Sequence, residues 1–203
     1  NLANSIIPDT IHVQSYWVTR PDGNQISPFS SWGVTNELTL KPDITAIGGS
    51  VVSAYKSGSI AISSGTSMAS PAIAGISVLV RQYLKSTTNL SGRELAAAVD
   101  KLMMSSASPV TDADSGLPFS PRVQGAGLVD AGKAVSVGAY INVAGTDKSK
   151  FELGDDRART GCYTMTFDVV NITNETKVYN LSVSALTESA VCGRVNPDHT
   201  YEY

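Results

Sequence analysis

The chain has 203 residues, of which 42% are hydrophobic and 16% are charged, and its formal net charge is -3. This composition is that of a globular protein, and the weak negative charge gives no indication of binding to nucleic acid or to an anionic membrane surface. No stretch approaches the ~20 apolar residues of a membrane-spanning helix, so we expect no membrane span in this chain.

Up to about Ala139 the sequence alternates short β-like runs with helical patterns. Such alternation is typical of α/β proteins with a largely parallel sheet, and we predict that fold class here. The predicted strands cover residues 11–18, 43–46, 51–55 and 59–63. The chain opens with NLANSIIPD, which lacks both an initiating methionine and the pattern of a signal peptide. We therefore expect an internal piece of a longer protein.

A helix is predicted over residues 68–84. Its first half, MASPAIAGISVLV, is apolar or small on every face, which predicts a helix buried on all sides. Ala74 and Gly75 are expected to be small because neighbouring backbone packs against them. Pro71 is expected in the first turn, where a missing N–H costs little.

Two further helices follow, each with a capping signal. The sequence SGRE at residues 91–94 has the pattern of a capping box and opens a helix that we expect to run to about Met104. Asp130 is expected to cap a short helix over residues 131–137.

After about Ala139 the pattern becomes that of β-structure. Residues 163–170 and 178–185 alternate apolar and polar side chains on either side of the polar turn NITNET, which indicates the start of an all-β domain. We therefore predict one domain over residues 1–139 and a second over residues 140–203. Cys162 and Cys192 fit either a disulfide between two strands or two free thiols.

The candidate chemistry lies in SSGTSMASPAIAG, residues 63–75. A serine hydroxyl needs a base to remove its proton and hydrogen-bond donors to hold the resulting oxyanion. Ser67, at the start of the predicted helix, would obtain such donors from the free N–H groups of the first turn. The competing interpretation is a Ser/Thr cap of an ordinary helix, and the residues alone leave both open.

GTSMASP at residues 65–71 resembles the serine motif of the subtilisin-like serine proteases, or subtilases. FSSWG at residues 29–33 and LKPDITA at 40–46 are similar to the family segments just before the serine, and SPRVQGAGLVD at 120–130 to the segment that closes the catalytic domain. The combination most resembles the lactocepin-type cell-envelope proteinases and related complement-cleaving peptidases. Ile47 departs from the family pattern, which usually has proline there.

The resemblance implies that Ser67 is the nucleophile and that its own N–H is one oxyanion donor. The family's aspartate, histidine and oxyanion asparagine precede the serine, so we expect them in a missing N-terminal part of the same protein, which would then be a partner of this chain. His12 and His199 are expected to be structural because neither lies in the family's histidine motif. Asp43 is expected to cap nearby N–H groups rather than act as a catalytic acid.

The same resemblance implies that this chain is the C-terminal part of a subtilase domain with a parallel sheet, followed by an incomplete β-sandwich of fibronectin-type-III-like type. The expected function is that of a secreted or cell-surface serine endopeptidase of a bacterial envelope, acting on protein or peptide substrates through an acyl-enzyme. No cofactor is expected for the chemistry, although a structural calcium ion with unassigned ligands fits the resemblance. The alternative is a non-catalytic binding or adhesion module on a degenerate protease scaffold.

Overall fold

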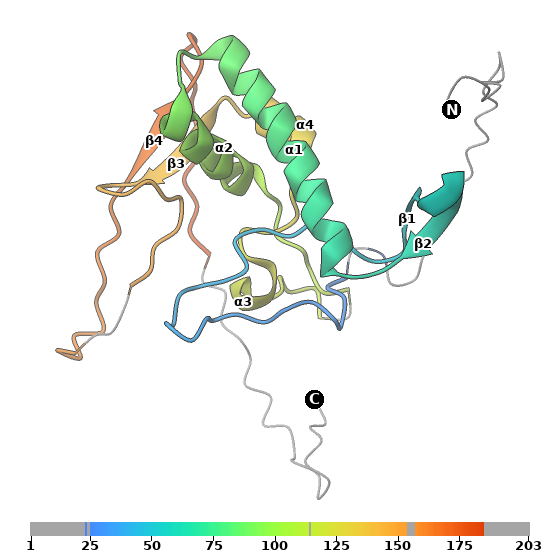
Figure 1. Ribbon diagram of the computed structural model, residues 1–203. Helices are drawn as coiled ribbons and strands as arrows, with labels where there is room; N and C mark the ends of the chain where they lie inside the picture. Colours follow the sequence, from blue (N-terminus) through green and yellow to red (C-terminus); the bar gives the residue numbers. More distant parts are fainter. Residues whose placement is uncertain (1–22, 24, 114, 154–156, 185–203) are drawn as a thin grey trace, which may run out of the picture.

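The computed structural model describes residues 23, 25–113, 115–153 and 157–184. In chain order its elements are β1 (Val51–Ala54), a 3₁₀ turn η1 (Lys56–Gly58), β2 (Ile60–Ser63), α1 (Thr66–Thr87), α2 (Gly92–Ser106), α3 (Pro121–Gln124), α4 (Ala131–Ser136), β3 (Ala139–Val143) and β4 (Phe167–Asn171). Helices α1 and α2 lie side by side, β3 packs against α2, and the β1–β2 hairpin extends away from the helices (Figure 1). The predicted strand at residues 11–18 lies outside the described residues.

The largely parallel sheet predicted for the first part of the chain is absent from the described residues. Instead, β1 pairs with β2 and β3 pairs with β4, both antiparallel, in two separate two-stranded sheets. The segment predicted as a strand at residues 43–46 makes only an isolated parallel bridge, between Thr45 and Leu128. The strands predicted at residues 51–55 and 59–63 are present as β1 and β2. They pair with each other across a short turn and are not joined by a helical crossover.

Helix α1 confirms the predicted helix, but the expectation that it is buried on all sides is wrong for this structure. Only Val80 and Leu84 are buried along its length, whereas the side chains of Val78 and Leu79 are 63% and 54% exposed. Helices α2 and α4 pack against α1 and leave these two side chains uncovered. Gly75 is exposed, and a Cβ added there would meet nothing within 4 Å, so close backbone packing does not explain its size.

Pro71 also differs from its predicted place. Because α1 begins at Thr66, Pro71 is the sixth helical residue and lies beyond the first turn. A helical N–H at this position would donate to the carbonyl of Ser67, and proline has no N–H to donate. The carbonyl of Ser67 therefore lacks its usual intrahelical partner.

The hydrophobic core lies between α1, α2, α4 and β3. Its buried members come from all four elements and from the segment that leads into α4: Val80, Leu84, Leu95, Ala98, Val99, Leu102, Met103, Val129, Ala134 and Tyr140. Lys101 of α2 is also buried, and its Nζ donates to Oδ1 of Asn142 at 2.9 Å and lies 5.4 Å from the centre of the Tyr140 ring. Buried charges are stable when they are paired in this way, so Lys101 links α2 to β3.

The predicted helix caps are partly confirmed. Asp130 caps α4, where its Oδ1 accepts from the N–H of Lys133 at 3.0 Å. Ser91 occupies the N-cap of α2, but its side chain makes no capping hydrogen bond, so the reciprocal bonds of a capping box are not formed.

The two predicted strands of the later region do not pair with each other. Strand β4 covers the end of the predicted 163–170 strand, but residues 178–184 form no strand and β4 pairs with β3 instead. The NITNET turn between them is held by Asn171, whose Oδ1 accepts from the N–H of Thr173 at 2.9 Å. A β-sandwich is not formed by the described residues. Cys162 is exposed and Cys192 lies outside the described residues, so both cysteine alternatives stand.

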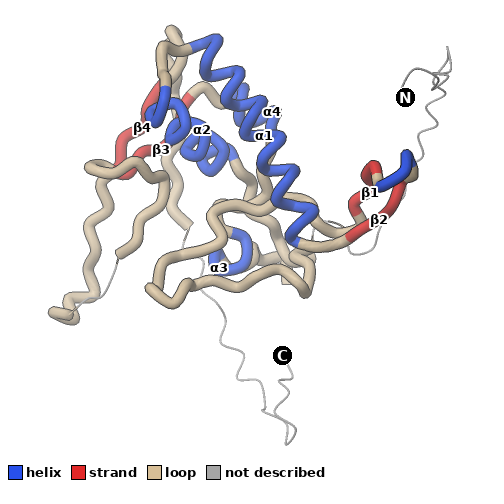
Figure 2. The backbone as a smooth tube through the Cα atoms, in the orientation of Figure 1, coloured by secondary structure: helices blue, strands red, loops and turns tan. Residues whose placement is uncertain are grey.

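Loops surround the short helix α3 and fill the region below the start of α1 (Figure 2). Gln124, which is 1% exposed, organises them: its Oε1 accepts from the N–H of Val110 at 2.6 Å and its Nε2 donates to the carbonyl of Phe119 at 2.5 Å. A buried amide with its hydrogen bonds satisfied fixes the loops that meet at it.

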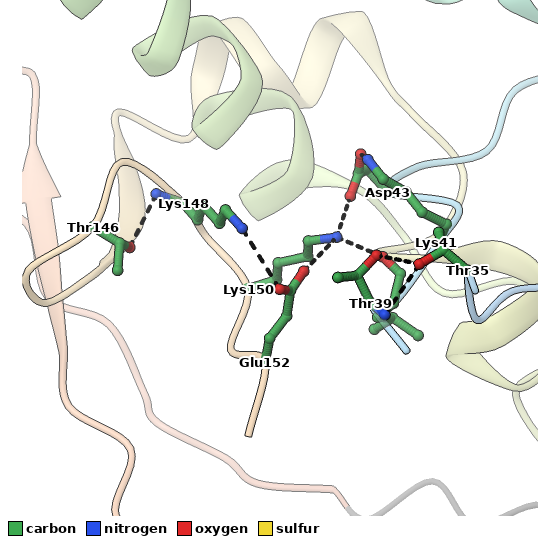
Figure 3. Close-up of polar contacts among 9 residues, drawn as sticks. Thr35, Thr39, Lys41, Asp43, Thr146, Lys148, Lys150 and Glu152 are labelled. Carbon is green, nitrogen blue, oxygen red and sulfur yellow. Dashed lines mark hydrogen bonds and ion pairs between the residues drawn. The ribbon is translucent and has the colours of Figure 1, made fainter. Parts of the chain in front are cut away.

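One long loop segment, residues 40–48, runs through this region and is called the support segment below. Two charged residues of its first half, Lys41 and Asp43, form ion pairs in a group that also contains Lys150 and Glu152. We call these four residues the lysine clasp (Figure 3). Burial raises the pKa of Asp43, but hydrogen bonds and positive charge from Lys150 and Lys41 lower it by more, so the pKa of Asp43 lies below its ordinary value of 3.8.

We predict that Leu84→Ala lowers the free energy of unfolding by about 2–5 kcal/mol, because Leu84 is fully buried between α1 and its neighbours. The matched control is Gln82→Ala, which truncates an exposed residue on the same helix and should change stability by less than about 0.5 kcal/mol. Urea denaturation measures both. Equal effects of the two substitutions would contradict the packing described for α1.

A second prediction concerns pH. Partial burial raises the pKa of Asp100 on α2 above its ordinary value of 3.8, repulsion from Asp43 raises it further, and Lys41 opposes both. A carboxyl group with a raised pKa binds its proton more tightly in the folded chain, so the free energy of unfolding falls as the pH rises from about 3.8 through the raised pKa. Asp100→Asn cannot ionise, and we expect it to be more stable than the wild type at neutral pH.

Below the ordinary pKa of 3.8 both forms are uncharged, and the difference between wild type and Asp100→Asn should disappear. Denaturation curves at acid and neutral pH measure this. Asp168→Asn, which removes an exposed carboxylate from β4, is the control. An Asp100→Asn protein no more stable than wild type at neutral pH would show that the assigned surroundings of Asp100 are wrong.

Candidate active site

The segment GTSMASP places Ser67 second in α1, at the end of the helix nearest the β1–β2 hairpin (Figure 1). The Ser67 side chain is exposed and makes no hydrogen bond to any other residue that the structure describes. Its neighbour Ser64 differs, because the Ser64 Oγ accepts from the N–H of Ser50 at 2.8 Å. Of these two serines, Ser64 is used to hold the loop and Ser67 presents an unused hydroxyl.

Helix capping does not account for Ser67. The N-cap residue of α1 is Gly65, which has no side chain, and α1 has no side-chain capping bond. Instead the carbonyl of Gly65 accepts from the N–H of Met68 at 3.0 Å and of Ala69 at 3.4 Å. The N–H groups of Thr66 and Ser67 precede the first intrahelical bond and point from the helix start, where the helix dipole favours negative charge.

Gly65 keeps space free around the Ser67 hydroxyl. Its φ of +156° is one that residues with side chains rarely adopt, and a Cβ added at this position would lie 3.1 Å from Oγ of Ser67. Any larger residue at position 65 would therefore crowd the hydroxyl as well as strain the backbone.

The support segment ends directly against Gly65. The N–H of Gly65 donates to the carbonyl of Gly48 at 2.8 Å. A Cβ added at Gly48 would lie only 2.7 Å from the carbonyl oxygen of Gly65 and 3.2 Å from Cβ of Ala69. The approach of the two segments thus requires glycine at position 48, and it fixes the backbone just before Ser67.

A pocket of about 330 Å³ opens beside this contact. Its lining includes Gly48 at the end of the support segment and Gly49 directly after it, Thr66 and Ala69 of α1, and Phe29 from the FSSWG segment. Thr66 and Ala69 lie on either side of Ser67 in the sequence, so the pocket borders the first turn of α1 that carries Ser67, although Ser67 is not itself a lining residue. Sequence reasoning did not identify this pocket, although the paired glycines after LKPDITA were a signal of close backbone approach.

The described part of the chain brings no base to Ser67. Both histidines of the sequence, His12 and His199, lie outside the described residues. Asp43 takes part in the lysine clasp, where its carboxylate pairs with Lys41 and Lys150 rather than capping backbone N–H groups as expected. Its backbone carbonyl accepts from the N–H of Ala126 at 3.0 Å.

Over residues 23–184, apart from the positions that the structure does not describe, no group of three or more histidine, cysteine, aspartate or glutamate side chains is placed to hold a metal ion. The structural calcium ion implied by the resemblance, whose ligands can also be backbone carbonyl oxygens, stays a prediction. None of the described helices is both long and apolar enough to cross a bilayer.

The subtilase family model matches residues 6–127. The chain is 40% identical to the C5a peptidase of Streptococcus pyogenes over 134 residues, which cover 66% of this chain and 12% of the peptidase. It is 32% identical to the PI-type proteinase of Lactococcus lactis subsp. cremoris over 187 residues, which cover 86% of this chain and 10% of the proteinase. The chain thus spans about a tenth of the length of these curated relatives.

The family match covers the FSSWG and LKPDITA segments, the GTSMASP motif and most of the SPRVQGAGLVD segment. These are the parts of the chain that form the support segment, the start of α1 and the pocket between them. The chain belongs to the subtilase family of peptidases.

Proposed function

We propose that this chain supplies the nucleophilic serine of a subtilisin-like serine endopeptidase, and that Ser67 is that serine. The observation that carries the proposal is the exposed hydroxyl of Ser67 at the start of α1, which has no hydrogen bond to any described residue, in a helix turn whose residues Thr66 and Ala69 line a pocket. Two relatives are named as a C5a peptidase and a PI-type proteinase, which supports the same reaction class.

In the proposed mechanism, Ser67 Oγ attacks the carbonyl carbon of a peptide bond while a histidine takes the hydroxyl proton. The N–H of Ser67 donates to the oxyanion, and the dipole of α1 stabilises its negative charge. The proton passes from the histidine to the leaving amine, and water then hydrolyses the acyl-enzyme. The pocket beside Thr66 and Ala69 receives part of the bound peptide.

The histidine, its aspartate partner and a side-chain oxyanion donor come, in this proposal, from an N-terminal part of the same protein. The exposed apolar side chains of Val78 and Leu79 support this, because a helix face of this kind is stable when another segment covers it. We also propose that the protein is secreted or held at the bacterial surface, and that residues 140–203 begin a fibronectin-type-III-like domain.

The direct test substitutes Ser67 in the complete protein. We expect Ser67→Ala to lower turnover on a casein substrate by about 10⁴-fold or more, because removal of a triad member typically has that effect. A fluorophosphonate probe should label the wild type on the peptide that contains Ser67. Ser70→Ala removes another exposed serine one turn further along and should leave both readouts unchanged.

Full activity in Ser67→Ala, or labelling of a different residue, would contradict the assignment of the nucleophile. A folded complete protein that neither labels nor cleaves casein would instead favour the alternative, a binding or adhesion module on a protease scaffold.

A separate prediction tests how the nucleophile is held. Gly48→Ala would place a methyl group 2.7 Å from the carbonyl oxygen of Gly65 and push the start of α1 away. We expect the fluorophosphonate labelling rate to fall by about tenfold or more, because a misplacement of about 1 Å can cost on the order of 10²-fold in rate.

Gly75→Ala is the matched control, because Gly75 is an exposed glycine of α1 where an added Cβ would meet nothing within 4 Å. It should label at the wild-type rate. Similar labelling of the two variants would mean that the contact between Gly48 and Gly65 does not position Ser67.

A further inference from the structure

Lys150 makes three polar contacts at a site that is far from Ser67 in the sequence. Its Nζ lies 2.7 Å from Oδ1 of Asp43 and 3.4 Å from Oε1 of Glu152, and it donates to the backbone carbonyl of Leu40 (Figure 3). The contact with Leu40 is a hydrogen bond, and the contacts with Asp43 and Glu152 are ion pairs. The Lys150 side chain is only 14% exposed, which makes these contacts less screened by salt than those of a surface lysine.

Two of these contacts hold the support segment at its first half. Leu40 and Asp43 both belong to the support segment, so Lys150 fixes a main-chain carbonyl and a side chain of the same stretch. Lys150 itself follows β3 and lies beyond residues 6–127, which the family model matches.

The middle of the support segment is held by backbone bonds to residues 126–129. The carbonyl of Asp43 accepts from the N–H of Ala126 at 3.0 Å, the N–H of Thr45 donates to Gly127 at 2.9 Å, and the carbonyl of Thr45 accepts from Val129 at 2.9 Å. The far end reaches Gly48, which accepts from Gly65 at 2.8 Å. The support segment therefore connects the lysine clasp at one end with Gly48 at the other. Gly48 is hydrogen-bonded to Gly65, which lies two positions before Ser67.

We propose that Lys150 is a positioning residue for Ser67, which it serves by fixing the support segment at the end opposite Gly48. This proposal rests on the proposed function of Ser67 as the nucleophile. Without Lys150 the carbonyl of Leu40 loses this donor and Asp43 keeps only Lys41 among its lysine partners. A shift of the support segment is then passed through its backbone to the bond between Gly48 and Gly65.

The chain offers a close control in Lys148. Its Nζ lies 3.6 Å from Oε2 of Glu152, its side chain is 58% exposed, and among the described residues none of its hydrogen bonds or ion pairs is to the support segment. Lys148→Gln removes one positive charge from the same loop and leaves the contacts of Lys150 with Leu40 and Asp43 intact. The groups that face Asp43 from the packed elements are Lys41, Lys150 and Asp100, and all three are unchanged in this control.

The test compares Lys150→Gln, Lys150→Arg and Lys148→Gln in the complete protein, at a temperature where thermal melts show each to be folded. The readouts are the rate of fluorophosphonate labelling at Ser67 and kcat and KM on one peptide substrate. We expect Lys150→Gln to label about 3- to 30-fold more slowly, the range of couplings carried through packed networks. kcat should fall more than KM rises, because the reacting atom rather than the substrate is displaced.

Lys150→Arg keeps the positive charge and the donors, so it should recover most of the labelling rate. Lys148→Gln should label at the wild-type rate. A folded Lys150→Gln protein that labels and turns over like Lys148→Gln would overturn the positioning role. A wild-type protein that does not label at Ser67 would instead refute the proposed function, so the two failures are told apart.

Should Lys150→Gln fail to fold, Asp43→Asn is assayed in the same way, because it weakens one contact of Lys150 and keeps the donation to Leu40. Slower labelling by folded Asp43→Asn supports the positioning role, and wild-type labelling overturns it. Failure of both variants to fold would show that the lysine clasp is needed for the fold as a whole, which also overturns a specific role in positioning.

Discussion

The hydrogen bond from the N–H of Gly65 to the carbonyl of Gly48 joins the support segment to the start of α1. Both partners are glycines because the two backbones come too close for a Cβ at position 48, and a Cβ at position 65 would crowd the Ser67 hydroxyl. The exposed serine is thereby placed on a rigid helix whose first turn supplies N–H donors. In our proposal, the pocket and the lysine clasp matter for function because the pocket borders this contact and the lysine clasp fixes the other end of the support segment.

The packing of α1 explains why its two ends have different roles. Toward its C-terminal end, Val80 and Leu84 are buried in the core with α2, whereas Ser67 at its start is exposed. The apolar side chains of Val78 and Leu79 are left on the surface of this chain. A helix anchored at one end and uncovered along one face suits an enzyme in which another segment brings the base toward the serine.

The sequence predicted those features that depend on a few neighbouring residues. The helix over 68–84, the cap at Asp130 and the β1 and β2 runs follow from local patterns, and the structure contains all of them. Burial of α1 was not predictable, because small residues such as Ala74 and Gly75 suit either a packed or an exposed face. The pairing of β4 with β3, and the contact of Lys150 with Leu40 across 110 positions, depend on distant segments that no local pattern identifies.

A crystal structure of the complete protein would test the central claim most directly, because it would show what approaches Ser67. We predict an imidazole nitrogen within about 3 Å of Ser67 Oγ, the expected reach of a general base. The same structure should keep the bond between Gly48 and Gly65 and show another segment over Val78 and Leu79. A Ser67 hydroxyl covered by a neighbouring segment, with no base in reach, would contradict the account.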